Sequence, residues 1–273
     1  MTLAARECFG FPFLCPLWRF FSRAAVTLAI LVVSVLCSSP ARAQGGPPFI
    51  TDDPGTPGTN HWEINTGYIY NLDSSPGTSS YELPHIDLNY GWGPRIQLKY
   101  EVGLALLKLP GRPLTSGLSN SLAGVKYRFL DEDAHGFSMS TYPQLEFNNL
   151  TSSVRRGLAE SGTQFFLPIE VARKIGKFET DAEVGYLVRS GDPDNFVYGG
   201  LAGRSLGERL ELLVEFHGTF VRGTHDNEFL SDFGGRLQTS KHTNLLFMTG
   251  HSVFRIPNQT PGWFGYLGIQ VVL

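Results

Sequence analysis

The chain has few cysteines, and all of them lie within the first 37 residues. The three are Cys8, Cys15 and Cys37. A mature chain that begins after residue 43 therefore contains no disulfide, no thiolate metal site and no cysteine nucleophile. The seven histidines are scattered, and none has a second histidine two or four residues away to build a zinc site. We predict no bound metal and no cofactor.

Long apolar runs are absent after the N-terminus. Basic Arg6, Arg19 and Arg23 precede an apolar run over 24–37, and "SSPARAQ" then offers an A-x-A cleavage site that ends at Ala43. This predominantly apolar run of 14 residues is shorter than the ~20 that a membrane-spanning helix needs, so residues 1–43 are predicted to be a secretory signal peptide. Because no later run could cross a bilayer as a helix, strands are the remaining spanning option.

Basic residues are also scarce after residue 43. Cleavage removes four basic residues and one acidic residue, which leaves 18 basic against 24 acidic residues and a formal net charge of −6. A nucleic-acid partner is therefore not expected. The sequence has no Gly-rich phosphate loop and no G-x-S-x-G motif, and we predict that the protein is not an enzyme.

The mature chain instead shows apolar and polar residues that alternate with period two, the pattern of a β-strand with one apolar face. The clearest case is "RIQLKYEVGL" at 95–104. The same pattern recurs in "HWEINTGYIY", "HIDLNY", "VKYRF", "FETDAEVGYLV" and "RLELLVEFHGTF", in a last strand at 263–273, and more weakly near 137–147, 162–174, 196–206, 229–238 and 243–253. No segment carries a useful helical stripe. We count about twelve strands, within the range of outer-membrane barrels.

The connections between these strands alternate in length. Longer segments are expected at 71–80, 105–118, 148–161, 189–195, 221–228 and 254–261, and tight ones at 91–94, 131–136, 175–177, 207–208 and 239–242. Short turns at one rim and long loops at the other are typical of outer-membrane barrels, in which aromatic residues also gather near the strand ends. We therefore predict an all-β fold, a transmembrane antiparallel β-barrel over 61–273, after a Pro/Gly-rich periplasmic lead-in at 44–60.

In such a barrel the apolar face of each strand meets lipid and the polar face lines the lumen. The predicted lumen-lining residues are Glu63, His85, Asp87, Asn89, Arg95, Gln97, Lys99, Glu101, Lys126, Arg128, Glu179, Asp181, Glu183, Arg209, Glu211, Glu215 and His217. They could form a selectivity lining, or a mutually neutralising network that fills the lumen. The acids Glu179, Asp181 and Glu183 share one strand face and are expected to meet basic residues on an adjacent strand rather than to bind a cation. Asp52 and Asp53 precede Pro and Gly and are read as turn formers rather than as a metal site.

Two segments carry a family resemblance. "PPFITDDPGTPGTNHWEINTGY" and "LPHIDLNYGWGPRIQLKYEVGL" resemble the bacterial outer-membrane family named for the meta-pathway of phenol degradation, often labelled a transporter, and the likeness is sharp over 48–104. The resemblance implies a barrel of about a dozen strands, linked in some members to aromatic catabolism, and carries over no catalytic residue. The chain departs from the usual pattern at Leu273, where outer-membrane strands commonly end on an aromatic residue that the barrel-assembly machinery reads.

These features predict a protein of the bacterial outer membrane that passes small molecules passively through a charged lumen, with hydrophobic or aromatic solutes if the resemblance holds. The expected partners are outer-membrane lipid, the barrel-assembly machinery and a small-molecule solute that the sequence does not name. Two alternatives stay open. One is a lipase-like barrel enzyme, suggested by His251 and Ser252, although neighbours on a strand point to opposite faces and cannot pair as base and nucleophile. The other is a structural barrel whose lumen is plugged.

Overall fold

Antiparallel strands make up most of the chain in the computed structural model, which describes residues 46–72, 77–225, 227–254 and 262–273. All of these residues belong to one unit. The predicted signal peptide at 1–43 and the first two residues of the lead-in lie outside the described residues. Within the described part of the chain, no helix is long and apolar enough to cross a membrane.

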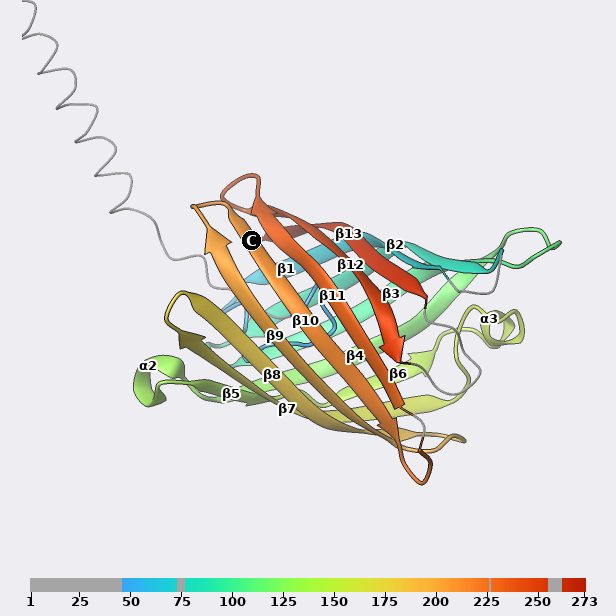
Figure 1. The fold of residues 1–273 in the computed structure, drawn as a ribbon, viewed down its shortest axis with the longest axis horizontal. Coiled ribbons are helices and arrows are strands. Elements are labelled where there is room, and N and C mark those ends of the chain that lie inside the picture. Colours follow the sequence, from blue (N-terminus) through green and yellow to red (C-terminus); the bar gives the residue numbers. More distant parts are fainter. Residues whose placement is uncertain (1–45, 73–76, 226, 255–261) are drawn as a thin grey trace, which may run out of the picture. The chain divides into compact units, whose positions relative to one another are not determined.

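The elements follow one another as a meander of hairpins (Figure 1). They are β1 (Trp62–Leu72), β2 (Ser79–Trp92), β3 (Ile96–Lys108), β4 (Thr115–Leu130), α2 (Glu132–His135), β5 (Ser138–Thr141), β6 (Gln144–Asn148), α3 (Thr151–Arg155), β7 (Thr163–Ile175), β8 (Phe178–Arg189), β9 (Asn195–Leu206), β10 (Leu210–Val221), β11 (Asn227–Gln238), β12 (Thr243–Phe254) and β13 (Trp263–Val272).

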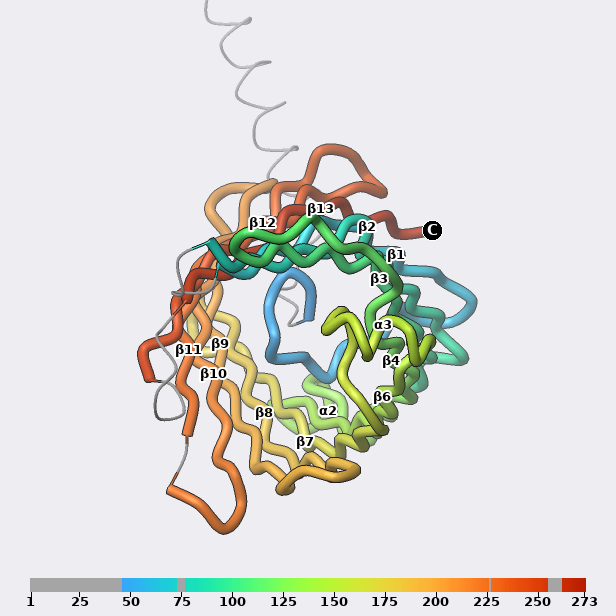
Figure 2. The backbone as a smooth tube through the Cα atoms, turned by 90° about the vertical axis from the view of Figure 1, so that its right-hand side faces the viewer, coloured from blue at the N-terminus to red at the C-terminus, as the bar shows by residue number. Residues whose placement is uncertain are grey.

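The sheet closes on itself because its first and last strands pair. β1 and β13 are antiparallel, with a register that runs from Glu63 opposite Val272 to Leu72 opposite Trp263. β5 and β6 are two halves of one strand, since each of them pairs with both β4 and β7. The prediction of a barrel of about twelve strands is therefore confirmed as a closed antiparallel barrel of twelve, which Figure 2 shows end on.

Most connections follow the length sorting that the sequence predicts, with one exception: 131–137 at one end of the barrel has seven residues, against six in 109–114 at the other end. One end of the barrel, called here the turn rim, carries the short connections 93–95, 131–137, 176–177, 207–209 and 239–242, and α2 lies in the second of them. The opposite end, the loop rim, carries 109–114, 149–162 and 190–194 among the fully described connections, and α3 lies in the second of them. Gly176 has a φ of 64° in the two-residue turn 176–177, a conformation that glycine adopts without strain.

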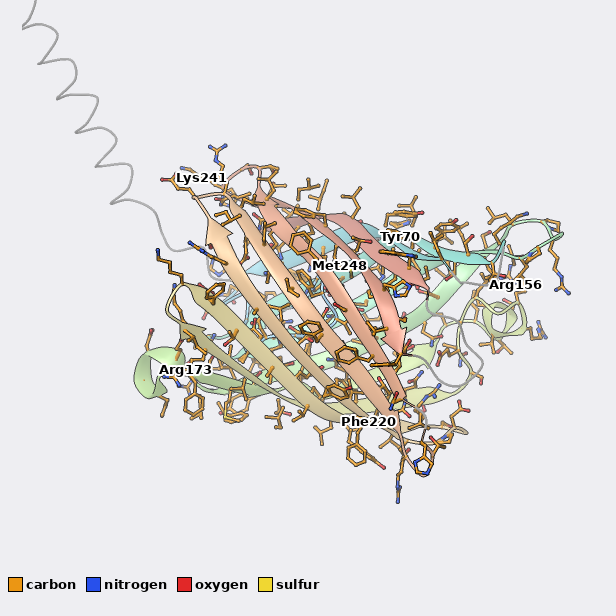
Figure 3. All side chains as sticks on the ribbon, viewed as in Figure 1. Tyr70, Arg156, Arg173, Phe220, Lys241 and Met248 are labelled. Carbon is orange, nitrogen blue, oxygen red and sulfur yellow. The ribbon has the colours of Figure 1, made fainter. Side chains whose placement is uncertain are left out.

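The two faces of the sheet have opposite polarity, and it is the apolar face that points outward. Val184 of β8 is 61% exposed, and Phe216 of β10 and Leu267 of β13 are also exposed. Charged groups are instead buried inside, among them Lys126 and Glu170 at 1% and 0% exposure. Figure 3 shows side chains covering the outer surface, with the labelled Arg173 and Lys241 toward one end and Arg156 toward the other. Such a surface suits lipid rather than water.

Candidate functional site

Residues 46–58 lie inside the ring of strands, as the blue segment in Figure 2 shows. The Glu215 carboxylate of β10 accepts hydrogen bonds from the backbone N–H groups of Ile50, at 3.0 Å, and Thr51, at 2.5 Å. On β11, Arg236 donates to the carbonyl oxygens of Gly46 and Pro47 at 3.4 and 3.2 Å. We call residues 46–58 the inserted segment.

A lysine of β4 binds the middle of the inserted segment. Lys126 Nζ donates to Asp52 Oδ1 at 2.8 Å and to the backbone carbonyl of Asp53. Asp53 also accepts from the Gly55 N–H, so the expected turn role of this pair is present together with an ion pair that the turn pattern does not reveal. The sequence leaves open whether the lead-in folds into the lumen; its residues 46–58 lie inside the barrel, where three strands supply partners for its polar groups.

Two lysines form the centre of the buried charge network. Lys126 lies 3.6 Å from Glu170, and its Nζ is 4.7 Å from the centroid of the Tyr142 ring. Lys99 pairs with Asp87 at 3.7 Å and with Glu101. Each buried cation thus has two carboxylate partners, which offsets the cost of removing it from water.

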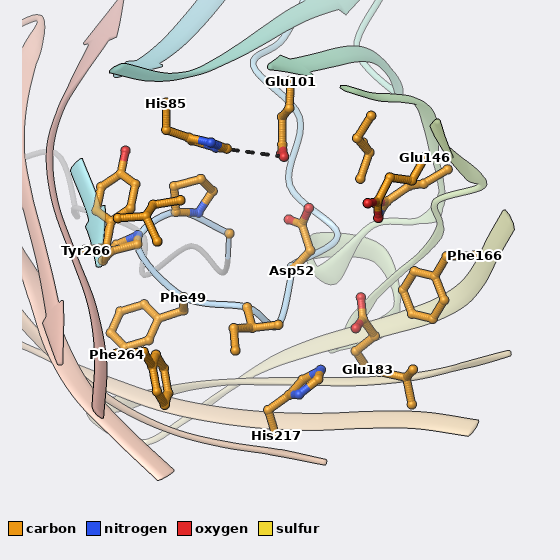
Figure 4. A pocket seen from close by; sticks show the side chains of 18 of the residues that line it. Phe49, Asp52, His85, Glu101, Glu146, Phe166, Glu183, His217, Phe264 and Tyr266 are labelled. Carbon is orange, nitrogen blue, oxygen red and sulfur yellow. Dashed lines mark ion pairs between the residues drawn. The ribbon is translucent and has the colours of Figure 1, made fainter. Parts of the chain in front are cut away.

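A cavity of about 540 Å³ lies inside the barrel next to the inserted segment, which contributes Pro48, Phe49 and Asp52 to its wall. Strand residues complete the lining from β1–β4, β6–β10, β12 and β13. Figure 4 shows Glu146, Phe166 and Glu183 on one side and Phe49, Phe264 and Tyr266 on the opposite side. The cavity therefore has a carboxylate wall and an apolar wall, and its volume lies in the range of small-molecule sites.

Most of the lumen-lining candidates lie inside the barrel or beside the inserted segment. The buried ones are Asp87, Asn89, Gln97, Lys126, Asp181, Glu183, Glu211, Glu215 and His217. Four others face interior cavities: His85, Lys99 and Glu101 line the large one, and Glu63 lines a smaller one that the inserted segment also lines.

Four candidates lie at or near the turn rim instead. Arg95 is 49% exposed and pairs with Asp131, which also forms an ion pair with Arg128, whose Nε lies 2.9 Å from Asp131 Oδ1. Arg209 is exposed in the turn that precedes β10, and Glu179 is near the start of β8. The period-two pattern places these residues on the inner face but does not tell how near the strand end each of them lies. The tight turn at 91–94 makes Arg95 and Lys99 the two expected partners of Asp87, and it is Lys99 that pairs with Asp87, at 3.7 Å, while Arg95 pairs with Asp131.

The expectation for the acids of β8 holds for one residue and is wrong for two. Glu179 pairs with Lys174 of β7 at 3.3 Å. Asp181 is opposite Ala172 of β7, and Glu183 is opposite Glu170. On the other side, β9 presents glycine or leucine to all three acids. Register, which the sequence of β8 alone does not specify, decides this outcome.

Several residues of the site were not predicted. Tyr142 is fully buried beside both lysines, but Tyr142 and Pro143 interrupt the strand, so the alternation cannot be read there. Phe264 and Tyr266 of β13 face the cavity. Their neighbours in the strand are likewise apolar residues or glycines, so polarity does not mark the inner face. In a strand that is apolar on both faces, periodicity does not separate the inside from the outside.

The groups that suggested a lipase do not come together. Ser252 is buried at 1% exposure, and the ring of His251 lies edge-on to Trp263, with 5.0 Å between the centroids. Across the described ranges, no group of three or more His, Asp or Glu side chains could hold a metal ion.

Comparison with known proteins connects this fold to outer-membrane barrels. No family model and no curated protein matches the chain. Among solved structures, an outer membrane channel from Pseudomonas putida F1 is similar with a TM-score of 0.60 at 12% identity, covering 84% of this chain and 100% of its own. The KdgM porin gives a TM-score of 0.54 at 8% identity, covering 76% and 98%, and the NanC porin gives 0.52 at 8%, covering 77% and 98%. At these identities the likeness establishes the fold, that of porin-like outer-membrane β-barrels.

Proposed function

We propose that the chain is a passive channel for small molecules in the bacterial outer membrane. The observation that carries this proposal is the inverted polarity of the sheet, which exposes apolar side chains and buries charged ones around an interior cavity. A lipid-facing exterior and a polar lumen are the two properties that a channel through the outer membrane needs. No nucleotide-binding motif occurs in the sequence to drive transport, so movement follows the solute gradient.

Secretion, insertion into the outer membrane and contact with lipid are supported by separate observations. The pattern of residues 1–43 supports secretion through a cleaved signal peptide and later insertion by the barrel-assembly machinery. The fold shared with an outer membrane channel and two porins supports the outer membrane as the location and lipid as the partner of the outer face.

The solute class is supported by the cavity wall and by the sequence resemblance. Phe49, Phe166, Phe264 and Tyr266 give the cavity aromatic surface that suits an aromatic or hydrophobic small molecule. The resemblance of residues 48–104 to the phenol-degradation meta-pathway family favours the same class. Charged residues such as Lys99 and Glu101 would then orient the solute within the lumen.

Purified protein reconstituted in planar lipid bilayers is expected to show discrete single-channel conductance in potassium chloride. The inserted segment occupies part of the lumen, so the conductance should be small compared with that of a wide porin. Complete absence of channel events, together with unchanged solute uptake in a deletion strain, would contradict the proposal and favour a plugged structural barrel.

The folded barrel is expected to migrate anomalously on a denaturing gel unless the sample is boiled. Closure through the β1–β13 pair leaves the sheet no free edge, and a closed sheet of this kind resists detergent until it is heated. The measurement compares boiled and unboiled samples of the mature chain. Recovery of the mature chain as a soluble monomer without detergent would contradict the membrane assignment.

A further inference from the structure

The carboxylates that line the large cavity are not all balanced by cations. Asp52 has Lys126, at 2.8 Å, and Glu101 has Lys99. Glu146 accepts a hydrogen bond from Asn120 at 2.6 Å but forms no ion pair with a described residue. The fourth carboxylate is Glu183. The one lysine on the lining, Lys99, is already shared between Asp87 and Glu101.

Glu183 is the least balanced of these groups. Its side chain is 3% exposed, yet it makes no hydrogen bond or ion pair with any residue that the structure describes. Its cross-strand partner on β7 is another acid, Glu170, and Gly199 lies opposite it on β9. Figure 4 shows the Glu183 carboxylate directed into the cavity. A buried carboxylate without a partner is costly, and a cation delivered by a ligand would remove that cost.

An aromatic ring lies between the two unpaired acids. Phe166 of β7 is flanked by Glu146 of β6 and Glu183 of β8 on the same wall (Figure 4). Its ring lies over Gly185 of β8, where a Cβ atom would come within 2.3 Å of it. Carboxylates next to an aromatic face are the groups that bind an ammonium ion, through charge-assisted hydrogen bonds and a cation–π contact.

The opposite wall suits an uncharged body. Phe49, Phe264 and Tyr266 lie there, with Met248 and Ile69 also on the lining. Among the described residues, no group of three or more His, Cys, Asp or Glu side chains could hold a metal ion. A molecule that is cationic at one end and apolar at the other would satisfy both walls.

We propose that this cavity binds organic cations, namely amines whose ammonium group lies between Glu146 and Glu183 against Phe166. Their aromatic or aliphatic body extends toward Phe49, Phe264 and Tyr266. This inference names the solute class of the channel and rests on the function proposed above. Anionic aromatic compounds are disfavoured in the same cavity because two unpaired carboxylates face them.

Calorimetric titration of the purified protein in detergent tests the proposal with three probes that share one body. They are 2-phenylethylamine, the neutral 2-phenylethanol and the anionic phenylacetate. The amine is expected to bind roughly tenfold more tightly than the alcohol, because its ammonium group forms charge-assisted hydrogen bonds with the carboxylates that the neutral hydroxyl group cannot form. Phenylacetate should bind most weakly. Equal affinity for amine and alcohol, or no binding of the amine, would overturn the proposal.

Two variants locate the site. Glu183→Gln keeps the shape of the side chain and removes its charge, so the amine should lose roughly tenfold in affinity while the alcohol is unaffected. Glu208→Gln removes one carboxylate from an exposed position in the turn 207–209 and should leave both affinities unchanged. Anomalous migration of unboiled samples shows that each variant is folded. Wild-type amine affinity in folded Glu183→Gln would refute the site.

Conductance measured without amine separates this inference from the channel itself. A protein that conducts potassium chloride but does not bind 2-phenylethylamine would keep the proposed function and lose the solute class. A protein that binds the amine at Glu183 without conducting would keep the site and lose the channel.

Discussion

Val184→Arg is expected to prevent assembly of the barrel or to lower its free energy of unfolding by about 2–4 kcal/mol, the cost of an arginine near the bilayer midplane. Val184 lies in the middle of β8 and is 61% exposed on the outward face, where the hydrocarbon would surround the new charge. Urea unfolding of protein refolded into lipid vesicles measures the change. Heat-modifiable migration of the membrane fraction reports assembly in cells.

Val188→Arg provides a matched control for this experiment. Val188 is on the same strand and the same face, but it is one residue from the end of β8 at the loop rim. The cost near the interface falls to about 0–1 kcal/mol, so this variant should assemble. Equal tolerance of arginine at both positions would mean that the outer face meets water, and the membrane assignment would then be wrong.

Lys126→Met is expected to release the inserted segment and to destabilise the barrel. The substitution keeps the length of the side chain but leaves Asp52 and Glu170 without the cation that lies 2.8 and 3.6 Å from them. Removing one partner of a buried ion pair costs about 3–5 kcal/mol, less where lumen water reaches the remaining acids. We expect a lower free energy of unfolding, a larger single-channel conductance and faster proteolysis of the inserted segment.

Arg95→Met is the control for the loss of a cation. The Arg95–Asp131 pair is at the turn rim, and its arginine is 49% exposed. Exposed pairs contribute about 0–1 kcal/mol, so stability and conductance should change little. If the two variants behaved alike, Lys126 would not hold the inserted segment in the barrel.

Three strands hold the inserted segment in the lumen through different side chains. Lys126, Glu215 and Arg236 come from β4, β10 and β11, and each binds a different part of the inserted segment. The same segment lines both the large cavity and the smaller polar one that Glu63 and Gln97 also line. Under the proposed channel function, solutes would pass beside this segment, and its contacts would then affect passage as well as stability.

The strands and their sides could be predicted from the sequence because a period of two is a local property of a chain. In 95–104, the alternation identifies Leu98 and Tyr100 as outward residues, and both are exposed in the barrel. The alternation of short and long connections follows from the same strand boundaries. A closed barrel requires the first and last strands to pair, and β1 and β13 do pair.

Tertiary structure alone decided the contents of the lumen. The inserted segment has no period, and its place depends on Glu215 and Arg236, which follow it in the sequence by more than 150 residues. Register between β7 and β8 sets Glu183 opposite Glu170 rather than opposite a basic residue. Strand parity determines which side of the sheet a residue faces, but the partner it meets there depends on neighbouring strands and on a segment that the barrel encloses. For that reason the sequence by itself determined a membrane barrel with a charged interior, whereas the unpaired acids and the cavity they line emerged from the folded chain.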